Sequence, residues 1–294
     1  MPCEQEHISS LRGSYWSPMA TRFDDRLNCN EPPLVHQRCN SSILEAPTMT
    51  ASGPSALAQP LRNVILRLSN RARERRARIF QRTFRLSADT RILDLGSESG
   101  VAIRKVLDGS AVRPDNVYIA DIDESAVMQG ARTFGFRPVV IHEGQPLPFP
   151  DGIFDIVYCS SVIEHATVPK ADVWQIKSAK EFRSRSMIAQ RALAREICRV
   201  GRGYFVQTPS RLFPIESHSW LPFLGWLPRS MLIPALETCN RYWIKSTRPD
   251  FNLLDRRDMS DLFPDATLLT ERFLGFEKSI IAVRGATPSI LASV

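Results

Sequence analysis

The stretch that most constrains the fold of this chain lies between Arg91 and Asp121. It contains an apolar strand pattern (RILDL), a glycine-containing turn (GSESG), a helical segment and a second apolar strand pattern (NVYIA) that ends at Asp121. Glycines let such a turn bend tightly and approach a ligand, and an acid about 20 residues further on can accept hydrogen bonds from two ribose hydroxyls. The stretch therefore predicts a parallel α/β sheet with a nucleotide-type pocket.

The same turn indicates which cofactor fits the pocket. A dinucleotide fingerprint requires glycine at positions 96, 98 and 101, where this chain has Gly96, Glu98 and Val101. A carboxylate in the turn would face the pyrophosphate that NAD or FAD places at a helix N-terminus. S-adenosyl-L-methionine carries no phosphate and has a sulfonium cation. Glu98 therefore argues against a nicotinamide-dependent oxidoreductase and is compatible with S-adenosyl-L-methionine.

Three motifs resemble those of a known family. Asp94, Gly96 and Gly100 match the first motif of the class I S-adenosylmethionine-dependent methyltransferases, with Glu98 in place of the middle glycine. The segment LPFPDGIFDIVYCSSVIEHA, residues 147–166, resembles the fourth-strand block of the UbiE-like, or type 11, methyltransferases, and REICRVGRGYFVQTP, residues 195–209, continues that pattern. The resemblance covers roughly residues 88–285 and implies a methyltransferase domain over 87–294.

The alternation of short apolar runs and helical patterns predicts a parallel sheet with helices on both faces. Together with the resemblance, it predicts a Rossmann-like α/β fold: a seven-stranded, mostly parallel sheet that ends in an antiparallel C-terminal hairpin. Strands are expected at residues 91–95, 116–121, 138–141, 154–158, 202–207, 267–271 and 278–284. Helices are expected at residues 99–108, 124–134, 186–199 and 255–262.

Ligands of such sheets collect at the carboxyl ends of the strands. Asp121 can accept both ribose hydroxyls there, its alternative role being that of a helix cap or a turn acid, and Ile122 can cover the adenine. Glu143 stands where the resemblance implies an acid near the adenine amino group, and Asp155 is expected to be structural. The expected residues of the S-adenosyl-L-methionine site are Asp94, Gly96, Ser97, Gly100, Asp121, Ile122, Glu143, Gly144 and Ser160.

An apolar, proline-rich stretch follows the fifth strand: PSRLFPIESHSWLPFLGWLP, residues 209–228. It resembles an insert found in a subset of type 11 methyltransferases, and we expect a lid at about 209–250. In one interpretation His218 is a general base or orients the acceptor, with Glu216 as its partner and an aromatic wall from Trp220, Phe223 and Trp226. In the other, Glu216 and His218 only satisfy each other. His165, which follows Glu164, is the third candidate catalytic residue, with a pocket-shaping role as its alternative.

The N-terminal part differs from the rest in composition. Residues 1–55 lack an apolar period and are expected to be a disordered tail. Residues 56–86 predict a basic amphipathic helix that either packs on the sheet or contacts an anionic membrane. Nucleic acid is not expected as a partner despite the net charge of +7, because the arginines are accompanied by neither a docking motif nor interleaved aromatics.

The remaining signals bound location and partners. Six cysteines show no metal-ligand spacing, so no metal is expected. The longest uncharged apolar run is too short to span a bilayer, and the start of the sequence lacks a basic region before an apolar one, so a cytoplasmic protein is expected. The arginine-rich helix and the Trp/Pro lid add the hypothesis of peripheral membrane contact. We predict methyl transfer to a small-molecule, glycan or lipid-linked acceptor; the alternative is a non-catalytic S-adenosyl-L-methionine-binding or interaction protein.

Overall fold

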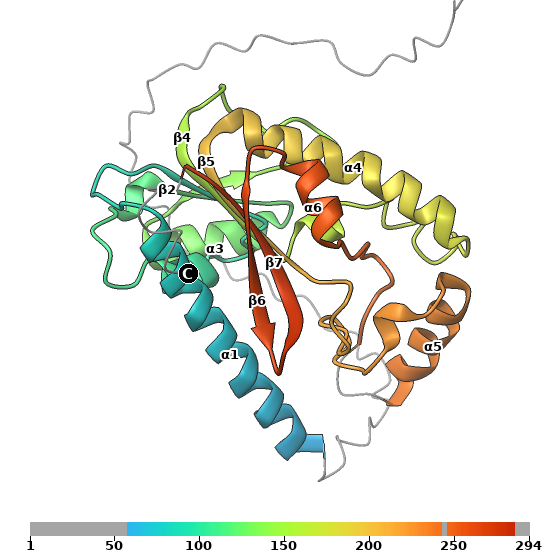
Figure 1. Cartoon of the computed structure of the whole chain (residues 1–294). Coiled ribbons are helices and arrows are strands. Elements are labelled where there is room, and N and C mark those ends of the chain that lie inside the picture. Colours follow the sequence, from blue (N-terminus) through green and yellow to red (C-terminus); the bar gives the residue numbers. More distant parts are fainter. Residues whose placement is uncertain (1–57, 243–245, 286–294) are drawn as a thin grey trace, which may run out of the picture. The chain divides into compact units, whose positions relative to one another are not determined.

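The computed structural model describes residues 58–242 and 246–285 of the chain (Figure 1). The tail expected at residues 1–55 lies outside the described residues. The strands are β1 (Ile92–Leu95), β2 (Val117–Asp121), β3 (Arg137–Val140), β4 (Phe154–Ser160), β5 (Gly201–Pro209), β6 (Thr267–Phe273) and β7 (Phe276–Arg284). The helices are α1 (Ala58–Thr83), α2 (Val101–Val106), α3 (Glu124–Phe134), α4 (Ala179–Val200), α5 (Arg229–Tyr242) and α6 (Arg256–Leu262).

The strands form one sheet in the order β3-β2-β1-β4-β5-β7-β6. Strands β1 to β5 run parallel, whereas β7 pairs antiparallel with both β5 and β6. The strand order reverses between β1 and β4, which is where open α/β sheets bind ligands. The fold class and all seven expected strands are confirmed.

Neighbouring residues of each central strand serve different layers of the core, as the period of a strand requires. Leu93, Val157 and Val206 pack with residues of α4 and α6. Ile92 and Ile156 pack with residues of α1, α2 and α3. Both faces of the sheet are therefore covered by helices, which explains why these strands are nearly continuous apolar runs.

Helix α1 packs on the sheet through its C-terminal half. Phe80 is fully buried, and Phe84, just after the helix, is nearly so. The guanidinium of Arg76 donates to Ser160 Oγ at 2.9 Å and to Glu271 Oε2 at 3.0 Å, which ties the helix to the ends of β4 and β6. The exposed face of the helix and its C-terminal extension carries Arg67, Arg71, Arg73, Arg75, Arg78, Arg82 and Arg85.

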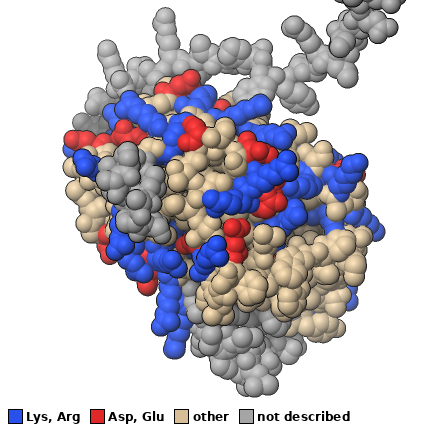
Figure 2. Space-filling model, viewed as in Figure 1, with Lys and Arg blue, Asp and Glu red and all other residues tan. Residues whose placement is uncertain are grey.

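The stretch after β5 contains a helix, α5, that the sequence did not predict. Pro234 lies inside α5, and the helix packs through Leu232 and Leu236 onto Leu224 and Phe251. Ser210 forms a parallel bridge with Leu254, so the two ends of the stretch lie side by side. We call residues 210–254 the insert. The surface around α5 is largely uncharged in the view of Figure 2.

Helix α4 begins earlier than expected, at Ala179. Ser178 accepts a hydrogen bond from the backbone of Glu181, which is the Ser-x-x-Glu pattern of a helix start. Over residues 58–242 and 246–285, none of the helices combines the length and the apolar character that a membrane span requires.

Candidate active site

The turn after β1 is held in left-handed conformations. Gly96 and Gly100 both have φ of 72°, and Glu98 between them has φ of 50°. A Cβ atom added to Gly96 would lie 2.4 Å from a methyl carbon of Val162, in the segment after β4. Glycine at position 96 is thus required both by the backbone conformation and by the close approach of Val162.

Asp121 at the end of β2 holds this turn in place. Its Oδ2 accepts from the backbone N–H of Glu98 at 2.8 Å, and its Oδ1 accepts from the N–H of Asp123 at 3.1 Å. The cap of helix α3 is Asp123, whose side chain accepts from Ala126, so Asp121 is not the cap. The alternative role of Asp121 as a turn acid is present in its two backbone hydrogen bonds. Each carboxylate oxygen offers about two acceptor positions, so Asp121 can still bind two hydroxyl groups.

Two polar groups at the end of β1 lack a partner. Asp94 is 2% exposed and Ser97 is 8% exposed. Asp94 Oδ2 and Ser97 Oγ have no hydrogen-bond partner within the described part of the chain. Burial, reinforced by the nearby charge of Asp121, raises the pKa of Asp94 well above its ordinary value. A cationic ligand at this position would satisfy both atoms and stabilise the ionised carboxylate.

The other residues expected at the cofactor site lie at the same edge of the sheet. Ile122 is 47% exposed directly after β2. Glu143 and Gly144 are exposed in the loop after β3, the strand that pairs with β2. Ser160, at the end of β4, is already engaged: its hydroxyl donates to Gln207 Oε1 at 2.8 Å and accepts from Arg76. Ser160 thus links α1 to the neighbouring strand.

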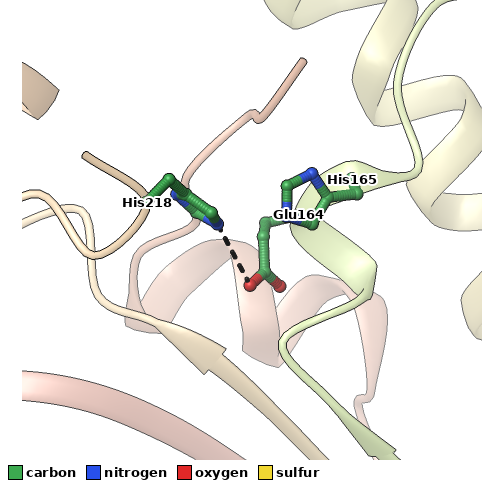
Figure 3. Close-up of side chains that lie close together, drawn as sticks. All are labelled: Glu164, His165 and His218. Carbon is green, nitrogen blue, oxygen red and sulfur yellow. Dashed lines mark ion pairs between the residues drawn. The ribbon is translucent and has the colours of Figure 1, made fainter. Parts of the chain in front are cut away.

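A second polar group lies after β4, where Glu164, His165 and His218 converge (Figure 3). Glu164 belongs to the short 3-10 helix Ile163–His165 and is fully buried. Its Oε2 accepts from Thr208 Oγ1 at 3.0 Å. Its Oε1 has no hydrogen-bond partner among the described residues and lies 3.8 Å from Nε2 of His218.

His218 is fixed by its neighbours in the insert. Its Nδ1 lies 2.6 Å from Glu216 Oε1, and its ring stacks on Phe251 with centroids 4.6 Å apart. Burial works against ionisation of Glu216, but the hydrogen bond and the charge of the His218 ring, the backbone N–H of His218 and the Ser219 side chain together lower the pKa of Glu216 to about 2. The expected pairing of Glu216 with His218 is therefore present, and it leaves Nε2 of His218 directed at Glu164.

His165 has a carboxylate partner of its own. Its Nδ1 lies 3.4 Å from Asp250 Oδ1, and its ring meets that of His218 edge to face, with centroids 4.7 Å apart. Burial alone would lower the pKa of His165, but the hydrogen bond to Asp250 and the charge of Glu164 raise it. The same pairing outweighs burial and lowers the pKa of Asp250.

The side-chain amide of Gln190 and the backbone N–H of Asn252 hold the backbone around Glu164. Gln190 of α4 donates to the carbonyls of Ile163 and Asn252, both at 3.0 Å. The N–H of Asn252 donates to the carbonyl of Glu164 at 2.8 Å. Sequence reasoning missed Gln190, Asn252 and Asp250, because each acts on a residue far away in the chain and belongs to no local motif.

A pocket of about 490 Å³ opens between the insert and the start of α4. Phe251, which stacks on His218, is part of its wall, so the pocket borders the polar group. Its lining is mainly apolar but also contains three arginines; it includes Phe182, Arg183, Arg211, Trp226, Arg229, Leu232 and Leu253. Such a wall suits a ligand with an apolar body and a polar or anionic group.

One family model matches part of the chain. The family model described as a methyltransferase domain matches residues 93–177. No curated protein matches the chain.

Solved structures show a likeness in fold alone. A chain from the complex between the Haloferax volcanii Trm112 methyltransferase activator and a protein assigned as a methyltransferase is 15% identical, with 74% of this chain and 90% of that chain covered and a TM-score of 0.45. An S-adenosylmethionine-dependent methyltransferase from Mesorhizobium loti is 13% identical over 70% of this chain and 94% of that chain, with a TM-score of 0.41. A second such enzyme, from Aquifex aeolicus, is 12% identical over 69% and 84%, with a TM-score of 0.37.

Proposed function

We propose that this chain, which carries a class I S-adenosyl-L-methionine-dependent methyltransferase domain, transfers a methyl group from S-adenosyl-L-methionine to an acceptor bound beside the insert. One contact carries the proposal. Val162 closes over Gly96 of the cofactor turn, and Glu164 and His165 follow two and three positions later. The expected donor site and the polar group that borders the pocket therefore share one short segment.

The residues at the strand ends fit the proposed cofactor. Asp121 has acceptor capacity left for the ribose hydroxyls, and the unpartnered atoms of Asp94 and Ser97 suit a cationic group. We expect Ile122 and Glu143, both exposed at the same edge of the sheet, to border the adenine. When bound, S-adenosyl-L-methionine supplies an electrophilic methyl group.

The polar group has the features needed to prepare an acceptor. Nε2 of His218 can accept the proton of an acceptor hydroxyl or amine while Glu216 stabilises the charged ring. His165, paired with Asp250, can orient the same acceptor. Holding the nucleophile in line with the methyl group contributes about 7 to 11 kcal/mol in well-aligned reactions, so positioning is the larger part of the task.

The wall of the pocket supports the class of acceptor. Phe182, Trp226 and Leu253 provide an apolar surface, and Arg183 and Arg211 lie among them. This mixture favours an amphipathic acceptor: a lipid-linked glycan, or a small molecule with an apolar body. We further propose peripheral contact with an anionic membrane, through the exposed arginines of α1 and the exposed apolar side chains of the insert.

Calorimetric titration of the purified protein with S-adenosyl-L-methionine, S-adenosylhomocysteine and NADH tests the cofactor. Micromolar binding of the first two and none of NADH is expected. A screen for transfer of labelled methyl groups to lipid-linked glycans, free glycans and small amphipathic molecules then tests the reaction. Binding without transfer to any acceptor would favour the alternative, a non-catalytic S-adenosyl-L-methionine-binding protein on this scaffold.

A further inference from the structure

Two unpartnered polar atoms face each other in the group after β4. Glu164 Oε1 and His218 Nε2 are both buried, and neither has a hydrogen-bond partner in the described segments. They lie 3.8 Å apart, which is too long for a hydrogen bond between them. A buried carboxylate oxygen and a buried ring nitrogen left in this way cost free energy unless something binds between them.

His165 completes a set of three ligand-type side chains. One ligand atom from each of Glu164, His165 and His218 lies within 4.8 Å of the other two. Metal bonds of about 2.0–2.2 Å in a tetrahedral site place ligand atoms roughly 3.4 Å apart. The separation of 3.8 Å between His218 and Glu164 therefore needs to shrink by only a few tenths of an ångström, and a rotation of the half-buried His165 ring brings in the third ligand.

Both imidazoles have a carboxylate partner at Nδ1, as many metal-bound histidines do. Nδ1 of His218 is paired with Glu216 at 2.6 Å, and Nδ1 of His165 is paired with Asp250 at 3.4 Å. A carboxylate that accepts a hydrogen bond from Nδ1 fixes the tautomer and leaves the lone pair of Nε2 free to bind a metal. This is the usual outer-sphere arrangement around metal-bound histidines. Stacking of His218 on Phe251 further limits how far that ring can turn.

We propose that Glu164, His165 and His218 bind a divalent transition-metal ion, with Glu216 and Asp250 as its outer-sphere partners. Two imidazoles and one carboxylate suit Zn²⁺, Co²⁺, Mn²⁺ or Fe²⁺ better than Ca²⁺ or Mg²⁺, which prefer oxygen ligands. Three protein ligands leave a coordination position open. The sequence expectation of no metal depended on cysteine spacing, and these ligands carry no local motif because residues 164 and 218 lie on either side of β5.

The role of the ion depends on the proposed function, whereas its binding does not. An acceptor hydroxyl bound at the open position would have a lower pKa, as water bound to zinc does. The hydroxyl would release its proton to water. Its oxygen would then form the bond to the methyl carbon, while the bond between that carbon and the sulfonium sulfur would break and leave its electron pair on sulfur, giving S-adenosylhomocysteine. With the metal bound, His218 would act as a metal ligand. Without the metal, it would act as the general base described under the proposed function.

Titration of the full-length protein with Co²⁺, in the absence of S-adenosyl-L-methionine and acceptor, tests the site. Visible absorption bands typical of four- or five-coordinate cobalt are expected to saturate at one ion per chain, and Zn²⁺ should displace them. His165→Gln and His218→Gln are each expected to weaken binding at least about 100-fold, and the outer-sphere change Glu216→Gln about 10- to 100-fold.

His142→Gln is the matched control, because His142 is exposed in the loop after β3 and outside the cluster. Thermal melting of each variant separates loss of the site from loss of the fold, and His165→Gln is the most informative change because its side chain is 36% exposed. No saturable Co²⁺ band, or a band that His165→Gln and His218→Gln leave at wild-type affinity, would overturn the metal site. Because donor and acceptor are absent, neither result depends on methyl transfer.

Discussion

Asp121 accepts a hydrogen bond from the backbone nitrogen of Glu98 at 2.8 Å, joining the end of β2 to the turn after β1. This contact explains how a glutamate replaces glycine at the centre of the motif. Glu98 adopts a left-handed φ of 50°, a conformation that costs a non-glycine residue about 1–2 kcal/mol. The hydrogen bond to Asp121 offsets part of that cost, and the Glu98 side chain remains exposed.

Asp121→Asn should therefore weaken S-adenosyl-L-methionine binding through two effects. The amide keeps one acceptor oxygen, but its NH₂ group would face the N–H of Glu98 or of Asp123, so the turn loses a support. It also removes acceptor positions for the ribose. Loss of a hydrogen bond to a charged group, worth about 1.5–3 kcal/mol, predicts roughly 10- to 100-fold weaker binding by calorimetry.

Asp123→Asn is the control for Asp121→Asn. Asp123 is two positions away and caps α3, where asparagine serves as well as aspartate. Its affinity for the cofactor should stay at the wild-type value. Equal losses in both variants would show that Asp121 matters only through the local backbone.

Gly96→Ala should reduce both stability and cofactor affinity. The alanine would have to adopt a left-handed backbone conformation, and its methyl carbon would lie 2.4 Å from a methyl carbon of Val162. Gly109→Ala measures the conformational cost alone, since Gly109 has φ of 73° and nothing within 4 Å of an added Cβ. The control should lose about 1–2 kcal/mol of unfolding free energy in urea, and Gly96→Ala distinctly more.

Val162→Ala is expected to rescue Gly96→Ala in part, because it removes the two methyl carbons nearest the added Cβ. Suppose that Gly96→Ala and Gly109→Ala lose the same free energy of unfolding, and that Val162→Ala restores stability to neither. Val162 would then not close over the turn as described.

Cofactor binding should release a proton from Asp94. Burial and the charge of Asp121 raise the pKa of Asp94 in the free protein, so part of the population is protonated at a pH where an ordinary aspartate is ionised. The cationic groups of S-adenosyl-L-methionine favour the ionised form. Affinity should therefore rise with pH and level off above the raised pKa.

Calorimetry in two buffers with different heats of ionisation measures this proton release directly. The observed binding enthalpy should differ between the buffers below the plateau, and Asp94→Asn should abolish the difference. Identical enthalpies for the wild-type protein across the acidic range would exclude Asp94 as the linked group.

The sequence predicted the strands and the glycine turn better than the insert and the polar group beside it. The strands and the glycine turn were predictable because their patterns are local: apolar runs bounded by turns, and Asp94, Gly96 and Gly100 within seven residues. Helix α5 was missed because Pro234 and the preceding proline-rich stretch favour a loop. Likewise, the pairing of His165 with Asp250 joins positions 85 residues apart, and no periodicity carries that information.

Arg229→Lys should loosen the insert while leaving the sheet folded. Arg229 is 4% exposed, lies over the ring of Phe182 and donates to the carbonyls of Val173, Ile176 and Pro249. Burial lowers its pKa to about 10, so it stays charged at neutral pH. A lysine cannot reach all three carbonyls, and each buried carbonyl left unpaired costs about 1–3 kcal/mol.

Hydrogen exchange is the measurement for Arg229→Lys. Amides of α5 should exchange faster while those of β1 and β4 keep their protection. Arg241→Lys, at an exposed position of the same helix, should exchange like the wild-type protein. If protection of α5 is the same in both variants, Arg229 does not hold the insert.

Phe223→Asn separates membrane contact from stability, because the two should change in opposite directions. Phe223 is 57% exposed and has a left-handed φ of 60°, which asparagine tolerates better than phenylalanine. The change should therefore leave the unfolding free energy equal or higher. Burial of a phenylalanine contributes about 1.5–3 kcal/mol, so binding to vesicles of phosphatidylcholine and phosphatidylglycerol should weaken roughly 10- to 100-fold in a sedimentation assay.

Met128→Gln, which removes an exposed apolar side chain on α3, should keep wild-type vesicle binding. The exposed arginines of α1 add a second expectation: binding should rise with the anionic lipid fraction and fall with rising salt, which screens this attraction. Salt-sensitive binding that Phe223→Asn leaves unchanged would assign the contact to α1 alone. Absence of binding to anionic vesicles would contradict the proposal of membrane contact and favour a freely diffusing acceptor.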